Sequence, residues 1–156
     1  MSSDTLPTSE STKPVGLTGW LALLAVGQIF GLLAYVVRLF QYYAGVPVQR
    51  GFLALPIAFI GEAILNIVFF LLISFSTYAI LTKKRCFRWL YISEVMGMPL
   101  LILLDAAWIS FTTALSFNNY LTHTDALQKA IAACIPGAVF TVYLFRSQRA
   151  KNTLIH

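Results

Sequence analysis

The stretch FIGEAILNIVFF, residues 59–70, carries one carboxylate and one amide among side chains that are otherwise apolar or absent. It lies inside a longer apolar segment, from about Phe52 to Leu81. A helix needs about 20 apolar residues to cross the hydrocarbon core of a bilayer. We therefore predict a membrane-spanning helix that holds Glu62 and Asn66 in the membrane, where such residues usually turn toward neighbouring helices.

The composition of the chain extends this prediction. The 156 residues are 58% hydrophobic and only 11% charged, with a net charge of +5, whereas soluble domains carry about 25% charged residues. Three more apolar segments are long enough to span a membrane, which leaves no room for a soluble catalytic domain. The basic residues lie beside apolar segments, so they indicate membrane anchoring and we expect no nucleic-acid partner.

The predicted fold is all-α, a bundle of four transmembrane helices. The chain divides into a disordered cytoplasmic tail at 1–16, a membrane domain at 17–146 with spans at about 17–43, 52–81, 89–116 and 126–145, and a basic cytoplasmic tail at 147–156. The first tail is rich in Ser, Thr and Pro and nearly lacks large apolar side chains, so it cannot bury enough surface to fold.

Local signals mark the helix boundaries. Pro56 suits the first turn of the second span, where a missing N–H costs nothing. Asp125, followed by Gln128, resembles a capping box that opens the fourth span. Pro99 and Pro136 lie inside the third and fourth spans, where we expect kinks that neighbouring helices accommodate.

The distribution of basic residues predicts the orientation. One side of the predicted bundle carries the basic loop between the second and third spans and the basic tail, with Lys83, Lys84, Arg85, Arg88, Arg146, Arg149 and Lys151. The other side offers only Arg50 and Lys129, apart from Arg38 at the end of the first span. The positive-inside rule then puts both termini in the cytoplasm. We expect these residues to contact anionic lipid headgroups, and the tail to be a candidate docking site for another protein.

Three ionisable residues fall at one depth. Counted from the cytoplasmic ends at about 1.5 Å per residue, Arg38 lies about 28 Å, Glu62 about 30 Å and Asp105 about 26 Å along their helices. Asn66 lies one turn below Glu62 on the same face. An unpaired charge at the centre of a membrane helix costs at least about 2.5–3.5 kcal/mol, and less near an interface. We therefore predict that Arg38 bridges Glu62 and Asp105.

Three interpretations of this polar cluster remain open. It is a structural clamp that fixes helix packing, or a proton- or cation-linked transport site open to the outside, or a group of residues that do not share one depth. The small residues Gly27, Gly31 and Ala34 share a face with Arg38 and predict close helix packing, as Gly137 does on the fourth span.

Other candidates are weaker. Glu94 is interpreted as a surface ion-pair partner of Arg88 or Lys84, and His123 as a solvated loop residue. Cys86 and Cys134 lie at different depths, too far apart for a disulfide. The sequence shows no nucleophile–base pair, phosphate loop, metal set or haem-ligand pair within the membrane. We therefore expect no enzyme, no catalytic residue, no cofactor and no metal site.

Short motifs at both ends of the chain, late in the first span and in the loop between the second and third spans carry a resemblance to a known family. These are GLTGWL at residues 16–21, the Arg–Leu pair in VVRLF at 36–40, the basic loop LTKKRCFRW at 81–89, and VYLFRSQRAKNTL at 142–154, which keeps Tyr143, Ser147, Arg149, Lys151, Asn152 and Thr153. On these motifs the chain resembles, over residues 16–154, the domain-of-unknown-function 2569 family of small bacterial inner-membrane proteins. Thr18, Val142, Ala150 and Leu154 depart from the family's usual glycine, proline, valine and phenylalanine.

The resemblance implies four spans and a bacterial cytoplasmic membrane, and it implies no activity. We expect a structural, accessory or partner-binding membrane protein. The alternative is a small proton- or cation-coupled transporter that uses the polar cluster.

Overall fold

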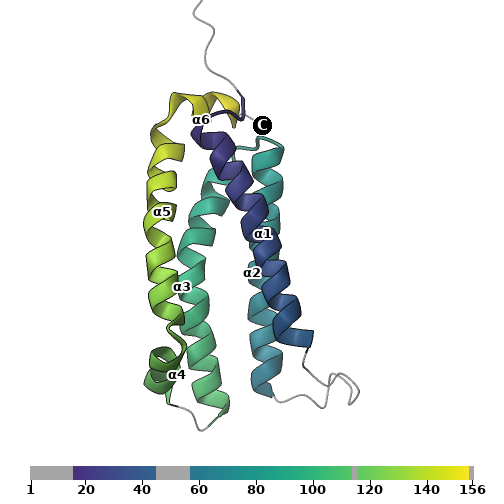
Figure 1. Cartoon of the computed structure of the whole chain (residues 1–156), viewed down its shortest axis with the longest axis vertical. Coiled ribbons are helices and arrows are strands. Elements are labelled where there is room, and N and C mark those ends of the chain that lie inside the picture. Colours follow the sequence, from purple (N-terminus) through teal and green to yellow (C-terminus); the bar gives the residue numbers. More distant parts are fainter. Residues whose placement is uncertain (1–15, 45–56, 114–115, 155–156) are drawn as a thin grey trace, which may run out of the picture.

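The structure is a computed structural model that describes residues 16–44, 57–113 and 116–154 (Figure 1). Within these ranges it contains helices and no strands: α1 (Trp20–Ala44), α2 (Ile57–Leu81), α3 (Phe87–Thr112), α4 (Phe117–Thr124), α5 (Ala126–Arg146) and α6 (Gln148–Thr153). The expectations for the tail before residue 16, for Arg50, for Pro56 and for the side chain of His123 fall outside what the structure describes.

Four of these helices are long and apolar enough to cross a membrane. They are α1, α2, α3 and residues 127–146 of α5. Large apolar side chains point outward along them; Phe30 of α1 is 67% exposed and Phe111 of α3 is 86% exposed. Such surfaces are stable only against lipid or another protein. The prediction of an all-α, four-span membrane bundle is confirmed.

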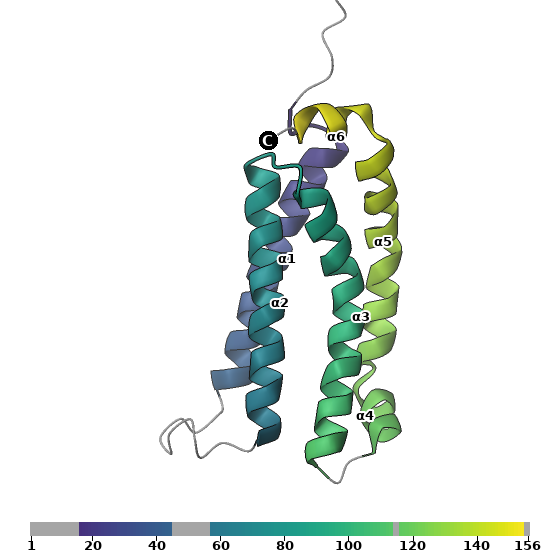
Figure 2. The same cartoon turned by 180° about the vertical axis from the view of Figure 1, so that it is seen from behind.

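The four long helices pack side by side in sequence order. α1 packs against α2, α2 against α3, and α3 against α5. Figures 1 and 2 show α1 with α2 on one side of the bundle and α3 with α5 on the other. α1 and α5 approach each other at one end, where the rings of Trp20 and Phe140 are 6.1 Å apart in an edge-on arrangement. We call this the basic end, because it also holds the turn at residues 82–86 and α6.

The apolar core lies at the basic end. Its fully buried side chains come from the start of α1, the end of α2, the start of α3, the end of α5 and the residue after α6, namely Leu21, Ile80, Phe87, Leu144 and Leu154. Van der Waals packing of this kind holds helices together where lipid weakens the hydrophobic effect. The bundle is therefore closed at the basic end.

α6 covers the basic end and ties the two ends of the described chain together. The Oγ of Ser147 accepts the Ala150 N–H at 3.4 Å and so caps the helix. Thr153 Oγ1 accepts the Gly16 N–H at 2.9 Å and donates to the Gly16 carbonyl at 3.4 Å. Ala150 and Thr153 are buried. Most of the segment expected to be a basic tail is thus a helix packed on the bundle.

α3 and α5 cross closely around Val95. A Cβ atom added to Gly137 would lie 2.8 Å from the Val95 methyl groups, so only glycine permits this approach. Pro99 has no N–H to donate to the Val95 carbonyl four residues earlier. The thiol of Cys134 donates to that carbonyl instead, at 3.4 Å. The neighbouring helix therefore accommodates the proline, and Cys134 has a structural contact.

The connection between α3 and α5 differs from the prediction. The third span was expected to reach residue 116, but α3 ends at Thr112 and a separate short helix, α4, follows. Asp125 has φ 47° and makes no side-chain cap hydrogen bond. A capping box requires an extended N-cap residue, so the capping box at Asp125 and Gln128 was wrong. Asp125 instead ends α4 in the left-handed conformation, which aspartate tolerates.

Candidate functional site

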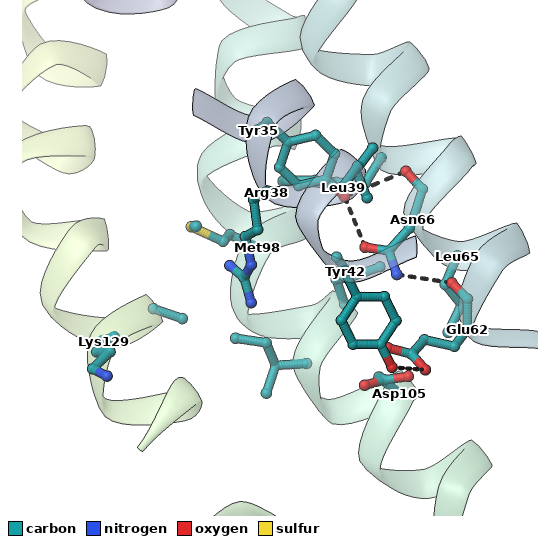
Figure 3. A pocket seen from close by; sticks show the side chains of 14 residues that line it. Tyr35, Arg38, Leu39, Tyr42, Glu62, Leu65, Asn66, Met98, Asp105 and Lys129 are labelled. Atoms are coloured by element: carbon teal, nitrogen blue, oxygen red, sulfur yellow. Dashed lines mark hydrogen bonds between the residues drawn. The ribbon is translucent and has the colours of Figure 1, made fainter. Parts of the chain in front are cut away.

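A cavity of about 660 Å³ lies between α1, α2, α3 and α5, away from the apolar core. The four residues of the predicted polar cluster, Arg38, Glu62, Asn66 and Asp105, all line it (Figure 3). Its lining also includes Tyr35, Tyr42 and Lys129, which the sequence analysis did not assign to the cluster. Ligand pockets in proteins have volumes of about 300–1,000 Å³, so this cavity is large enough to hold a small molecule or a lipid headgroup.

Glu62 is half-buried and is held by a tyrosine. The Tyr42 hydroxyl donates to Glu62 Oε2 at 2.7 Å. The Tyr42 ring is stacked parallel to Phe59, with centroids 6.5 Å apart, and it meets the Tyr43 ring edge-on at 5.0 Å. A short hydrogen bond to a carboxylate offsets part of its desolvation. The hydrogen bond from Tyr42 therefore helps to stabilise the Glu62 carboxylate within a membrane-spanning helix.

Asn66 joins α1 to α2. Its Oδ1 accepts the Tyr35 hydroxyl at 2.9 Å, and its Nδ2 donates to the Tyr43 hydroxyl at 3.3 Å. The same Nδ2 donates to the Glu62 carbonyl at 2.9 Å. The Tyr35 hydroxyl also lies 3.3 Å from the Asn66 carbonyl, which accepts from it, and Figure 3 shows both hydrogen bonds from Tyr35 and the one to Glu62 as dashed lines. The amide is therefore satisfied by several partners and orients the tyrosines of α1.

Arg38 does not make the predicted bridge to Glu62. Its exposed guanidinium forms no ion pair or hydrogen bond within the described part of the chain. The polar groups of α2 are instead bound by two tyrosines of α1. Tyr35 and Tyr42 are seven residues apart, occupy the stripe of α1 that faces α2, and donate to its polar groups. Arg38 lies between the two tyrosines on the same helix face and lines the cavity.

Asp105 and Lys129 complete the charged lining. Asp105, on α3, is half-buried, and its carboxylate lies on the same side of the cavity as Glu62 in Figure 3. Lys129, in the second turn of α5, is exposed and lies on the other side, beyond Arg38. The lining therefore has two cationic and two acidic side chains, on different walls.

A groove of about 700 Å³ adjoins the cavity and extends toward the basic end. The two share lining residues Tyr35, Arg38, Phe69 and Met98. The groove runs between α1 and α5 and is lined largely by apolar side chains, with the polar pair Gln28 and Glu94 among them.

Glu94 is not the surface ion-pair partner that we expected. Gln28 Nε2 donates to Glu94 Oε2 at 2.9 Å, and Gln28 is only 4% exposed. Arg88 lies six residues earlier, on a different face of α3, and donates to the Ala150 carbonyl at 3.2 Å. The prediction failed because residues six apart on a helix do not meet.

The small residues of α1 do not pack closely within this chain. Gly27 and Gly31 have no atom within 4 Å of an added Cβ, and Ala34 is exposed. All three line the groove. α5, which would have to approach them, is held against α3 through Gly137. Close packing at Gly27, Gly31 and Ala34 is therefore not made within the described chain, and packing of this face against a second copy stays a prediction, whereas Gly137 does lie in a close helix contact.

The basic residues named in the sequence analysis surround the basic end. Two of them have structural contacts besides Arg88: Lys84 lies 5.0 Å from the Tyr78 ring centroid, and Arg149 donates to Thr18 Oγ1 at 2.8 Å. The remaining side chains are exposed, and they are Lys83, Arg85, Arg146 and Lys151.

Sequence reasoning missed the tyrosines and Gln28. The signal for Tyr35 and Tyr42 was their spacing of seven residues, which places two hydroxyls on one helix face, but such residues are also typical of the membrane interface. Among the described residues, no group of three His, Cys, Asp or Glu side chains lies close enough to hold a metal ion. Cys86 and Cys134 are free.

Comparison with known proteins gives one match. The model of a family described as "Protein of unknown function (DUF2569)" matches residues 14–155. No curated protein and no solved structure matches the chain.

Proposed function

We propose a function for this chain on the premise that it belongs to the DUF2569 family of proteins of unknown function. In this proposal the chain is a non-enzymatic accessory protein of the bacterial inner membrane, with both termini in the cytoplasm. It binds a partner protein through its basic end. The multi-pass fold is the starting point, and the positive-inside rule supports the orientation, because the basic turn and α6 lie at one end of the bundle.

The observation that carries this proposal is the folded state of the basic end. α6 buries Ala150 and Thr153 against the bundle and leaves Lys151 exposed, while Lys83 and Arg85 are exposed on the neighbouring turn. Cations held on a folded surface need less ordering on binding than cations on a flexible tail. Such a surface suits a partner with an acidic face, since complementary charge favours association.

Cross-linking in intact cells tests the partner. We expect the triple substitution Lys83→Gln, Arg85→Gln and Lys151→Gln to remove a cross-linked partner, because these exposed side chains make no contact that the fold needs. Lys129→Gln, the same chemical change far from the basic end, is the matched control. Equal capture of the partner by the triple variant and by the unmodified protein would contradict the proposal.

Thiol labelling tests the orientation. A membrane-impermeant maleimide should modify the exposed Cys86 in inverted inner-membrane vesicles and not in intact spheroplasts. Labelling of Cys86 in spheroplasts would place the basic end outside the cytoplasm and refute both the orientation and the cytoplasmic partner.

A second candidate is a proton- or cation-coupled carrier. The carboxylates of Glu62 and Asp105 in one large cavity favour it, because membrane carboxylates often hold transported ions or protons. The substitutions Glu62→Gln and Asp105→Asn distinguish a carrier role of these carboxylates from a structural role. Normal insertion and stability with loss of a transport phenotype would support a carrier, whereas loss of stability alone would support a structural role for these carboxylates.

A further inference from the structure

The charges in the cavity are separated by sign. Arg38 and Lys129 come from α1 and α5, and Glu62 and Asp105 come from α2 and α3. Figure 3 shows the two basic side chains on one side and the two carboxylates on the other. A simple anion would be repelled by the two carboxylates, and a simple cation would be repelled by the two basic groups. A molecule with one negative and one positive group matches both walls.

The basic wall has no partner among the residues that the structure describes. The side chains of Arg38 and Lys129 form no hydrogen bond or ion pair within the ranges that the structure describes, although both lie in helices that span the membrane. A guanidinium in a membrane helix is stabilised by an anionic partner or by reaching water. Guanidinium and phosphate match well, because the planar group donates two parallel hydrogen bonds.

The acidic wall favours a primary ammonium group. A carboxylate accepts hydrogen bonds, and an alkylammonium has three N–H groups to donate. Glu62 already accepts one hydrogen bond from Tyr42, which fixes the position of its carboxylate. A trimethylated ammonium has no N–H and would satisfy this wall less well.

The groove beside the cavity provides space for an acyl chain. It continues from the cavity through four shared lining residues and runs between α1 and α5 toward the basic end. Its α1 wall is exposed at Gly27, Gly31 and Ala34, so no side chain of another helix covers this wall. An occupant can therefore enter sideways from the membrane. A free soluble zwitterion would use the cavity and leave this apolar groove empty.

We propose that the cavity and groove together bind one phospholipid with a phosphoethanolamine headgroup. Arg38 and Lys129 bind the phosphate, Glu62 and Asp105 bind the ammonium group, and one acyl chain lies along the groove. This site is independent of the partner proposed for the basic end, since none of its charged residues lies there.

Native mass spectrometry of the full chain, released from detergent micelles with defined lipids, tests the proposal. The probes are phosphatidylethanolamine, phosphatidylglycerol and phosphatidylcholine with identical acyl chains. We expect the unmodified protein to retain one phosphatidylethanolamine about tenfold more than either competitor, as the gain of a charge-assisted hydrogen bond implies. Equal retention of the three lipids would overturn the proposal.

Substitutions test which wall of the cavity binds the phosphate and which binds the ammonium group. Arg38→Gln with Lys129→Gln should abolish retention of every phospholipid, whereas Glu62→Gln should keep retention and lose the preference over phosphatidylglycerol. Gln128→Ala, which changes an exposed side chain beside Lys129 that lines neither the cavity nor the groove, is the control and should change neither. Unchanged retention by the Arg38 and Lys129 variant would overturn the assignment of the phosphate.

Two measurements on the unmodified protein keep the proposal testable if a variant fails to fold. Glycerophosphoethanolamine, the headgroup without acyl chains, should raise the thermal unfolding temperature much less than the complete lipid does. An equal effect would show a site for a soluble zwitterion and would overturn the lipid. A lipid-free dimer that excludes phosphatidylethanolamine would show that a second copy fills the groove, and would overturn the proposal as well.

Discussion

Replacing Gly61 with alanine tests what fixes the distance between α2 and α3. The indole of Trp108, on α3, lies directly over Gly61, and an added Cβ would collide with its Cε2, Nε1 and Cζ2 atoms. The indole N–H donates to the Ala58 carbonyl at 3.1 Å, so the ring is held in this position. A methyl group at Gly61 must therefore displace the ring or part the helices.

The expected change in the free energy of unfolding of Gly61→Ala combines two destabilising effects and one stabilising effect. Overpacking costs about 1–3 kcal/mol, and the lost indole hydrogen bond costs about 0.5–1.5 kcal/mol. Alanine gains about 1 kcal/mol over glycine in helix propensity. Gly27→Ala is the matched control, because it gains the same propensity and nothing lies within 4 Å of its new Cβ. The difference between the two variants isolates the collision, and we expect Gly61→Ala to be about 2–4 kcal/mol less stable.

The assay is reversible unfolding in mixed micelles, with helix content followed by circular dichroism as the denaturing detergent is increased. Tryptophan fluorescence in the same titration reports the surroundings of the indole. Equal free energies of unfolding for the two alanine variants would refute the reasoning, because they would mean that the contact over Gly61 does not limit helix approach.

Three further perturbations have expected outcomes. Gln28→Ala removes a donor from the Glu94 carboxylate inside the bundle and should lower the free energy of unfolding by about 1–3 kcal/mol; a change below about 0.5 kcal/mol would contradict this. Thr153→Val keeps the shape but removes two hydrogen bonds at the basic end, so hydrogen exchange should accelerate in α6 and stay unchanged in the middle of α3; uniform acceleration would argue against a local cap. Maleimide should modify the exposed Cys86 much faster than the half-buried Cys134 in micelles, and comparable rates would show that the contact between α3 and α5 is loose.

The spans could be predicted because a membrane helix satisfies its own backbone, so a long apolar run is enough to identify one. The ends of the helices were harder to predict where polar residues are frequent. The third span was expected to extend to residue 116, yet α3 ends at Thr112, and α4 has too many polar side chains to resemble a span. The left-handed conformation of Asp125 depends on how α4 meets α5, which local sequence does not specify.

The cavity was partly predictable. A count of helical rise gives the height of a residue along its helix, and Arg38, Glu62 and Asp105, which it placed at one level, line one cavity. The count does not identify side-chain contacts, so it could not show that Tyr42, one turn farther along the same face, rather than Arg38 would reach Glu62. The packing of α1 was missed for a related reason. A glycine pattern permits close approach, but which helix approaches depends on where the other helices find their own contacts.

The contact between Gly16 and Thr153 has a consequence for biosynthesis. The residue that fastens the start of the first transmembrane helix is translated after the fourth, so the basic end cannot close while the ribosome is still making the spans. Until then the first helix lacks the neighbours that Ala150 and Leu154 supply. A nascent chain that stalls early would expose this unfinished end, where quality-control proteases could distinguish it from the completed molecule.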